Sequence, residues 1–381
     1  MREGTSGHVV VAPDKFKGSL GAAGVAAAVA GGLRAAVPGL DAREHPVADG
    51  GDGTIEAATS AGFTRTEVRC TGPTGDTVVA ALAVRDGIAV VELAEASGLR
   101  RLPGGRPAAM TATSRGTGEL IRAALDLSCR QVVLGLGGSA CTDGGAGMIQ
   151  ALGGRLLDTA GADLSPGGGP LADLDRLDLS GLDPRVASTE FVVASDVDNP
   201  LTGPHGAAAV YGPQKGASAS EVALLDAALT RWAEVVRAAT GVDAAGVPGV
   251  GAAGGVGFAA VVFLRAELRS GIDYLLDLLD VRPALVGARL VVTGEGSLDE
   301  QTLHGKAPAG VAAAARAVGV PAVAVAGRNT LPAAALKSAG IAQAYALSDL
   351  EADPERCMRE PVPLLRRLAG QIAADWLGGG R

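Results

Sequence analysis

The chain has 381 residues, of which 48% are hydrophobic and 19% charged, a length and a balance that fit two globular domains. Its formal net charge is −8 and only 3% of its residues are aromatic, so it lacks the basic surface and the stacking side chains of a nucleic-acid binder. The four cysteines stand far apart and no apolar run reaches the roughly 18 residues of a membrane span, so we expect a cytoplasmic protein with no zinc site, disulfide framework or membrane partner.

The first sixty residues predict alternating strands and helices. A buried strand at His8–Ala12 is followed by a loop, and Ser19 is placed to cap a helix that runs to about Leu33. A second strand at Arg43–Val47 leads through a glycine-rich loop into a helix that ends near Ala61. This order is typical of an α/β domain with parallel strands.

The pattern changes in the middle of the chain. Three short β-rich segments are predicted to pair as antiparallel neighbours, namely Thr66–Cys70, Thr77–Val84 and Ile88–Leu93. Alternation then returns, with predicted helices and strands at Gly116–Leu127, Gln131–Leu136, Asp143–Leu152, Phe191–Ser195 and Ser220–Thr240. Between the last of these helices and the next strand, we expect Gly246–Gly257 to be a flexible loop.

The last hundred residues resemble the first sixty in style. Strands and helices alternate through Leu290–Thr293, Pro308–Val318, Pro321–Val325, Leu331–Ala339, Ala342–Leu347 and Pro363–Trp376. We therefore predict an α/β fold of two domains: a discontinuous parallel-sheet domain from residues 1–65 and 287–381, and a mixed α/β domain inserted at residues 66–286.

Lysine is rare in this chain, and its positions are informative. Only five of the 33 basic residues are lysine, and four of these five fall in glycine-containing loops. The loop Pro13–Ser19 places Lys15 and Lys17, with Ser19, between a strand and the start of a helix. Because helix N-termini and lysine ammonium groups both attract anions, we predict a phosphate site here; the alternative is a solvated turn.

Other strand-end loops combine glycine with carboxylates. In the loop Ala48–Thr54, both Asp49 and Asp52 are suited to bind magnesium or a substrate hydroxyl. For Asp52, capping of the following helix is an equally good interpretation. Later loops supply further candidates for binding substrate, phosphate or metal, which are Asp196, Asn199, Lys215, Glu295, Asp299 and Lys306.

A glycine-rich loop at Gly135–Gly145 follows one predicted strand. Its first part matches the dinucleotide fingerprint G-x-G-x-x-A, and Asp158 lies about where a ribose-binding acid would stand. The match is weak evidence in a chain with 57 glycines. The alternative to a binding site is a purely structural loop, in which the glycines allow a tight turn and close packing. We favour a backbone cradle for phosphate, with candidate residues Gly137 and Gly138.

This inventory of lysines, carboxylates and glycine amides suits phosphoryl transfer, in which cations and positioning do most of the work. The sequence has no G-x-S-x-G nucleophile elbow, and its histidines show no metal spacing, although His304 is a minor candidate. Gly305-Lys306 also lacks the remainder of a Walker loop. An aspartate that accepts the substrate proton would complete the set.

Seven segments of the chain resemble the glycerate kinases of the bacterial type. They run in the family's order from residue 12 to residue 312, and they are APDKFKGSL, VADGGDGT, CTGPTGD, TSRGTGELI, GLGGSACTDGGAGM, SDVDNPLTGPHGAAAVYGPQKGA and TGEGSLDEQTLHGKAPAGVA. Seven ordered segments are far more specific than any single glycine motif.

The resemblance implies a flavodoxin-like domain, a domain of restriction-enzyme-like topology and an active site between them. It also implies magnesium-dependent transfer of the ATP γ-phosphate to D-glycerate, giving 2-phosphoglycerate or, less in keeping with the family, 3-phosphoglycerate. By analogy we assign Asp196 as proton acceptor and Lys15 as the phosphate clamp, with Lys17 as a further catalytic residue. The same analogy adds Ser139 and Asp143 to the residues that bind substrate or phosphate, and it assigns Asp49 and Asp299 to magnesium. Whether the protein is a monomer or a homo-oligomer stays open.

The chain departs from the family's pattern at three places. Asp52 stands where glutamate is usual, Cys141-Thr142 replaces a Thr-Asn pair, and Arg115 occupies a position often held by an aromatic residue. Three other functions are kept as alternatives: an NAD(P) oxidoreductase, a non-catalytic regulator that binds a sugar acid, and a kinase for a neighbouring hydroxy acid.

Overall fold

The computed structural model describes residues 7–303 and 306–378, and contacts between residues divide the chain into two units. The terminal unit contains the residues up to Asp49, Glu56–Gly62 and the residues from Ile272 onward. The inserted unit contains Gly50–Ile55 and Phe63–Gly271.

The terminal unit is built on a five-stranded parallel sheet in the order β13-β12-β11-β1-β2. Its strands are β1 (His8–Pro13), β2 (Ala42–Glu44), β11 (Ala288–Leu298), β12 (Ala322–Asn329) and β13 (Ile341–Ala346). The chain moves from β1 to β2 on one side, and after the insertion it returns as β11 on the other side of β1. The carboxyl ends of β1 and β11 therefore form the topological switch point, where open α/β sheets bind their ligands.

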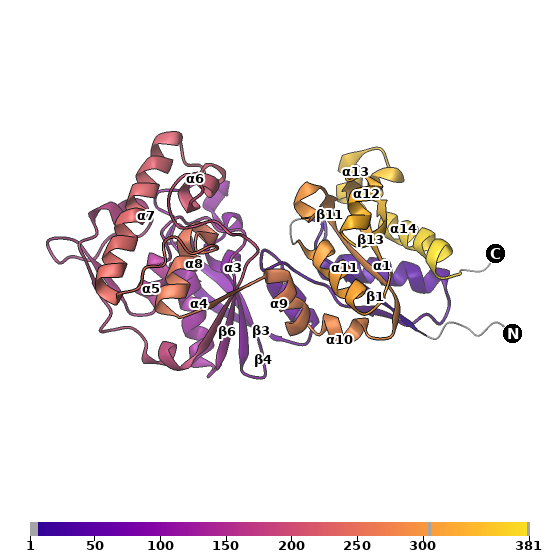
Figure 1. Ribbon diagram of the computed structural model, residues 1–381, viewed down its shortest axis with the longest axis horizontal. Coiled ribbons are helices and arrows are strands. Elements are labelled where there is room, and N and C mark those ends of the chain that lie inside the picture. Colours follow the sequence, from indigo (N-terminus) through magenta and orange to yellow (C-terminus); the bar gives the residue numbers. More distant parts are fainter. Residues whose placement is uncertain (1–6, 304–305, 379–381) are drawn as a thin grey trace. The chain divides into compact units, whose positions relative to one another are not determined.

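Helices connect and cover the strands of this sheet (Figure 1). They are α1 (Ala22–Ala36), α10 (Val281–Leu285), α11 (Ala307–Ala317), α12 (Ala333–Ser338), α13 (Pro354–Arg359) and α14 (Pro361–Trp376). Two further helices, α2 (Thr54–Ser60) and α9 (Gly271–Leu278), have their first residues in the inserted unit and the rest in this one. Helices α1 and α14 pack against each other, and they share one apolar core with alternate residues of the strands, such as Val9 and Val11. Helices α10 and α11 contact β1 and β11.

The inserted unit contains a six-stranded mixed sheet in the order β10-β9-β6-β5-β4-β3. Its strands are β3 (Thr64–Thr71), β4 (Thr77–Arg85), β5 (Ile88–Glu92), β6 (Gln131–Gly135), β9 (Glu190–Ala194) and β10 (Glu267–Arg269). The first three strands are antiparallel, as predicted, and the remaining pairs are parallel. A small antiparallel pair, β7 (Arg155–Leu157) with β8 (Arg176–Asp178), was not predicted.

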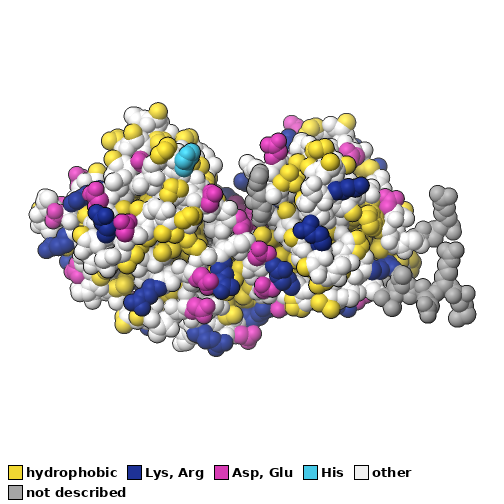
Figure 2. All heavy atoms as spheres, in the orientation of Figure 1, with side chains coloured by type: hydrophobic (Ala, Val, Ile, Leu, Met, Phe, Trp, Pro, Cys, Tyr) yellow, Lys and Arg dark blue, Asp and Glu magenta, His cyan; other side chains and the backbone are white. Residues whose placement is uncertain are grey.

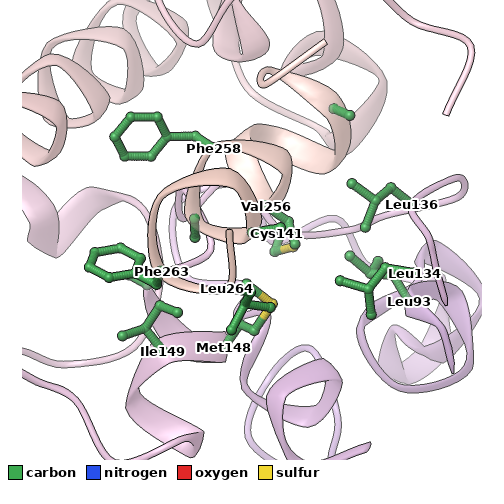
Figure 3. Close-up of a cluster of buried hydrophobic side chains, with 14 of the residues drawn as sticks. Leu93, Leu134, Leu136, Cys141, Met148, Ile149, Val256, Phe258, Phe263 and Leu264 are labelled. Atoms are coloured by element: carbon green, nitrogen blue, oxygen red, sulfur yellow. The ribbon is translucent and has the colours of Figure 1, made fainter. Parts of the chain in front are cut away.

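The helices of the inserted unit bury a large core (Figure 3). They are α3 (Leu93–Ser97), α4 (Arg115–Asp126), α5 (Ala146–Ala151), α6 (Ala207–Tyr211), α7 (Ala219–Thr240) and α8 (Ala252–Phe263). Trp232 of α7 is fully buried beside two phenylalanines of α8. Helix α7 begins with a complete capping box, in which Ser218 and Glu221 satisfy each other's backbone amides.

Three local predictions are wrong. Ser19 was predicted as the N-cap of α1, but the N-cap is Gly21 and the helix begins at Ala22, where Glu56 accepts a hydrogen bond from the Ala23 amide in place of a serine cap. Helix α5 begins at Ala146, three residues later than predicted, since Asp143 folds the preceding loop around its own carboxylate. The segment Gly246–Gly257 is not a flexible loop, because α8 starts inside it with a left-handed turn.

The boundary predicted at residue 287 also differs from the structure. Residues 272–286 belong to the terminal unit, because Ile272 packs against Gly310 of α11, and α10 lies against β1 and β11. The His8 imidazole pairs with the Ala284 carbonyl at 2.6 Å and fixes α10 there.

Among the described residues, no helix combines the length and the apolar character that a membrane span needs. The four cysteines are buried free thiols. On the face that Figure 2 presents, lysine and arginine side chains are interspersed with carboxylates rather than gathered in one basic patch.

Candidate active site

The loop after β1 lies at the switch point of the terminal unit. The Asp14 amide donates to the Gly294 carbonyl at 2.7 Å, which joins this loop to β11. The Asp14 carboxylate is 7% exposed and accepts a hydrogen bond from the Lys15 amide at 2.6 Å, while the Lys15 ammonium lies 3.5 Å from the same oxygen. A buried carboxylate and a lysine therefore share the end of β1.

Three carboxylates act on one another at this edge of the sheet. Burial raises the pKa of Asp14 to about 7; the Lys15 charge opposes this rise, and the charges of Asp49 and Glu295 add to it. Burial also raises the pKa of Glu295, which Thr302 and Lys306 oppose. The Thr302 hydroxyl donates to Glu295 at 2.6 Å, and the Lys306 ammonium lies 3.7 Å from it. The structure thus brings together Lys15, Asp49, Glu295 and Lys306. Glu295 lies on β11, and the other three lie in loops after β1, after β2 and before α11.

The other predicted residues of the terminal unit take smaller parts. Lys17 is exposed, and the Ser19 hydroxyl donates to the Met358 carbonyl at 2.6 Å, which anchors the loop. Asp299 is half-buried and accepts from the Gln301 amide at 3.0 Å, which closes the turn after β11. His304 lies outside the described residues.

In the inserted unit, the glycine-rich loop after β6 packs against the backbone of Gly50–Ile55, hereafter called segment 50–55. The Gly137 amide donates to the Gly50 carbonyl at 3.2 Å. A side chain at Gly135 would meet Gly50, one at Gly137 would collide with Gly51, and one at Gly50 would collide with the end of β9. These glycines are therefore required for close packing of two backbone segments.

The same loop does not have the form of a dinucleotide site. A stretch of ten residues separates the end of β6 from the start of α5, so the glycines do not open directly onto a helix. Asp158 accepts hydrogen bonds from the amides of Ala160 and Ala162 in a local turn. Gly138 is exposed with a positive φ of 74°, and Ser139 is nearly buried in a bridge with Gly98.

Asp143 lies inside the inserted unit and is 1% exposed. One of its oxygens accepts from the amide and the hydroxyl of Ser114, at 2.8 and 2.9 Å, and from the Gly147 amide at 3.2 Å. The other oxygen accepts from the Gly145 amide at 3.1 Å. These bonds join the starts of α4 and α5, so the structure gives Asp143 a role in folding; its ligand-binding role stays a prediction.

Lys215 is also 1% exposed, and its ammonium donates to the Cys141 carbonyl at 2.5 Å. Burial lowers its pKa, and the neighbouring Cys141 and Asp143 oppose this shift. The bond fixes the loop just before Asp143 from within. Binding of phosphate by Lys215 stays a prediction.

The loop after β9 places Asp196 at the surface and Asn199 in a fixed turn. Asp196 accepts from the Ser270 hydroxyl at 2.9 Å and from the Gly271 amide at 2.8 Å. The Asn199 side chain donates to the His205 carbonyl at 2.9 Å and accepts from the Tyr211 hydroxyl at 2.5 Å. The structure thus gives Asn199 a role in holding this loop.

Sequence reasoning missed two buried carboxylates, Asp14 and Glu92. Asp14 stands next to the two predicted lysines, but an aspartate in a short loop usually faces solvent. Glu92 is the last residue of β5 and shows no motif around it. A charged residue at the end of an apolar strand is the one sequence signal that Glu92 offers.

Among the described residues, no group of three or more histidine, cysteine, aspartate or glutamate side chains is arranged to hold a metal ion. The predicted magnesium ligands Asp49 and Asp299 therefore do not form a metal cage of that kind. Magnesium commonly binds through one or two carboxylates together with substrate phosphates and water, and the residues present fit that mode.

Comparisons of the sequence and of the structure with known proteins both match glycerate kinases. The glycerate kinase family model matches residues 9–377. A glycerate kinase of Bacillus subtilis is 44% identical over 96% of this chain and 97% of its own length. A glycerate 2-kinase of Escherichia coli is 42% identical over 98% of this chain and 99% of its own length.

A crystal structure from Salmonella typhimurium LT2, of a protein assigned as glycerate kinase 2, superposes with a TM-score of 0.83. It is 42% identical in sequence, and the match covers 97% of this chain and 98% of that one. The predicted family and the predicted class of enzyme, a kinase, are confirmed: the chain belongs to the glycerate kinase family.

Proposed function

We propose that this protein transfers the γ-phosphate of ATP to a hydroxyl of D-glycerate and releases 2-phosphoglycerate and ADP. The observation that supports this proposal most is the cluster of Lys15, Asp14, Asp49, Glu295 and Lys306 at the switch point of a chain in this family. The E. coli relative, which is named a glycerate 2-kinase, supports the 2-phosphate over the 3-phosphate.

Lysine side chains bind the phosphate groups in this proposal. Lys15 lies within ion-pair distance of Asp14, and Lys306 lies within ion-pair distance of Glu295. Burial raises the pKa of both carboxyl groups, that of Asp14 to about 7. In this proposal their ammonium groups stabilise charge on the transferring phosphoryl group, which is the main requirement of this reaction. Lys17, which is exposed in the same loop, supplies a further cation.

A carboxylate accepts the proton of the glycerate hydroxyl. Asp196 is our first assignment from sequence, and Asp14 is the second, because a pKa of about 7 suits a general base at neutral pH. The ion pair with Lys15 keeps a fraction of Asp14 charged at neutral pH. Comparing the Asp14→Asn and Asp196→Asn variants separates the two assignments, since only loss of the true base lowers kcat with little change in the KM for ATP.

Magnesium, held by Asp49 and Asp299 in this proposal, would neutralise charge on the ATP phosphates when bound. We also propose that the protein works in the cytoplasm, and that its units correspond to the flavodoxin-like and restriction-enzyme-like domains of the family. The strand order of the terminal unit supports the first of these labels, because without the insertion it is the order of flavodoxin-like sheets.

The oxidoreductase alternative has little support. It depends on Gly135 and Gly137 as a pyrophosphate cradle, and both glycines are used by contacts with segment 50–55. The regulator and the neighbouring hydroxy acid stay as alternatives that an assay distinguishes.

The test is release of ADP from ATP and magnesium by the purified protein, with D-glycerate present or omitted. We expect release that depends on glycerate and that stops when the magnesium is chelated. Binding of glycerate without ADP release would favour the alternative of a non-catalytic regulator. ADP release with another hydroxy acid, but not with D-glycerate, would show that the other hydroxy acid is the substrate.

A further inference from the structure

Glu92 occupies an unusual position for a charged residue. It ends β5, in the middle of the inserted unit's sheet, and it is 1% exposed. Burial raises its pKa to about 7. The charges of Glu95 and Asp52 add to this rise, whereas the hydrogen bond from the Ile55 amide and the charge of Arg100 oppose it. Because a buried carboxylate costs stability, its presence here calls for a role other than packing.

The contacts of Glu92 all lead to segment 50–55. One of its oxygens accepts from the Ile55 amide at 3.1 Å, and the other accepts from the Arg100 guanidinium at 3.2 Å. The same guanidinium nitrogen lies 3.3 Å from an oxygen of Asp52. That Asp52 oxygen is buried and makes no hydrogen bond among the described residues, so this ion pair is what satisfies it. Glu92 and Arg100 together hold the segment at two points.

Segment 50–55 needs such support because of its composition. Three of its six residues are glycine, and Gly50 and Gly53 have φ near +90°. Glycine loses more conformational freedom on ordering than any other residue, so this segment is costly to fix. Its remaining attachment to the loop after β6 is made by backbone groups. The segment directly follows Asp49, a predicted ligand.

We propose that Glu92 is a positioning residue for the proposed phosphoryl transfer. Glu92 acts with Arg100 to keep segment 50–55, and the adjoining Asp49, in one conformation. This inference rests on the proposed function for its effect on catalysis. The clamp itself rests only on the contacts of Glu92, Arg100, Asp52 and Ile55.

The chain offers a matched control three residues away. Glu95 lies on α3 and is also largely buried, and it accepts hydrogen bonds from the Ala81 amide at 3.2 Å and from the Arg101 guanidinium at 3.3 Å. Its backbone partner belongs to β4 and not to segment 50–55. Glu95 also lies 3.9 Å from the Arg100 guanidinium, but that contact is longer than those of Arg100 with Glu92 and Asp52. Glu95→Gln therefore removes a neighbouring charge and keeps the bonds from the Ile55 amide and from Arg100 to Glu92.

The experiment compares Glu92→Gln, Arg100→Gln and Glu95→Gln in the full-length protein. Amide hydrogen exchange is followed by mass spectrometry for the peptide that contains Ile55, and kcat and KM are measured with ATP and D-glycerate. We expect exchange of segment 50–55 to become about tenfold faster in the Glu92 and Arg100 variants, because a constraint worth roughly 1.4 kcal/mol is lost. We also expect kcat to fall about tenfold, with the KM for ATP changed less than about twofold.

Two results would overturn the proposal. Unchanged exchange of segment 50–55 in both clamp variants would show that Glu92 and Arg100 do not hold it. Equal acceleration in Glu95→Gln would show a general loosening of the unit and no specific clamp. If the wild-type protein releases no ADP with glycerate, the proposed function fails, whereas the exchange comparison still decides whether the clamp exists. Faster exchange with unchanged kcat would refute the catalytic part alone.

Discussion

Replacing Asp14 by asparagine is predicted to stabilise the folded protein while it impairs catalysis. The carboxylate is buried, and its pKa is raised from 3.8 to about 7. Because the pKa in the folded state is above the unfolded value, ionisation of Asp14 opposes folding. The contribution of protonated Asp14 to the free energy of unfolding is fully present below about pH 4 and is lost as the pH rises through about 7. Asparagine keeps the shape and never ionises.

The magnitude follows from that difference in pKa. The pKa rises by about three, and each pKa unit is worth about 1.4 kcal/mol. Full ionisation of Asp14 therefore lowers the free energy of unfolding by roughly 4 kcal/mol. Between about pH 5 and about pH 8, the wild-type protein loses about 2.5 kcal/mol from this group alone. The Asp14→Asn variant should therefore gain about that much relative to the wild type over the same interval, since effects of packing do not depend on pH.

Urea unfolding of both proteins at several pH values measures this difference. The control is Asp41→Asn, because hydrogen bonds from Arg43 lower the pKa of exposed Asp41, so its loss should destabilise rather than stabilise the protein above about pH 4. A stability difference between Asp14→Asn and the wild type that stays constant from pH 5 to pH 8 would refute the reasoning, because Asp14 would then ionise normally in the folded state.

Three further substitutions test the packing described above by their effect on the free energy of unfolding, each measured in urea. Asp143→Ala should destabilise the protein by about 3 kcal/mol, because it leaves five buried donors without their acceptor; a loss below about 1 kcal/mol would contradict this role. Gly50→Ala should cost at least about 2 kcal/mol, because a methyl group there meets the Ala194 carbonyl at a φ of 88°. Ala253→Gly should add about 1 kcal/mol, because Ala253 has a left-handed φ of 56°, and a destabilised variant would mean that its methyl group makes contacts worth more than the strain.

Most strands of both sheets could be predicted from sequence because parallel strands are continuous apolar runs between glycine-rich loops. The antiparallel pairing of β3, β4 and β5 followed from short segments joined by tight turns. The errors arise where distant residues decide local structure. Glu56, far along the chain, replaces the cap expected from Ser19, and Val256 begins regular helix inside a segment whose glycines suggested a loop.

The candidate site could be predicted only in part, for a physical reason. Lys15 and Glu295 were identified because they follow predicted strands, and strand order brings them together, although β11 extends past Glu295 to Leu298. Burial, by contrast, is a tertiary property that local sequence does not carry. Asp14 and Glu92 were therefore missed, and Asp143 was predicted as a ligand although its carboxylate accepts from five donors inside the fold.

The measurement that tests the central claim most directly couples the reaction to enolase, which acts on 2-phosphoglycerate as it forms. With ATP, magnesium and D-glycerate, we predict an enolase signal that matches the ADP released and that is lost in the Lys15→Met variant. ADP release without the enolase signal would contradict the assignment of the 2-hydroxyl. Absence of any glycerate-dependent ADP would contradict the proposed function itself.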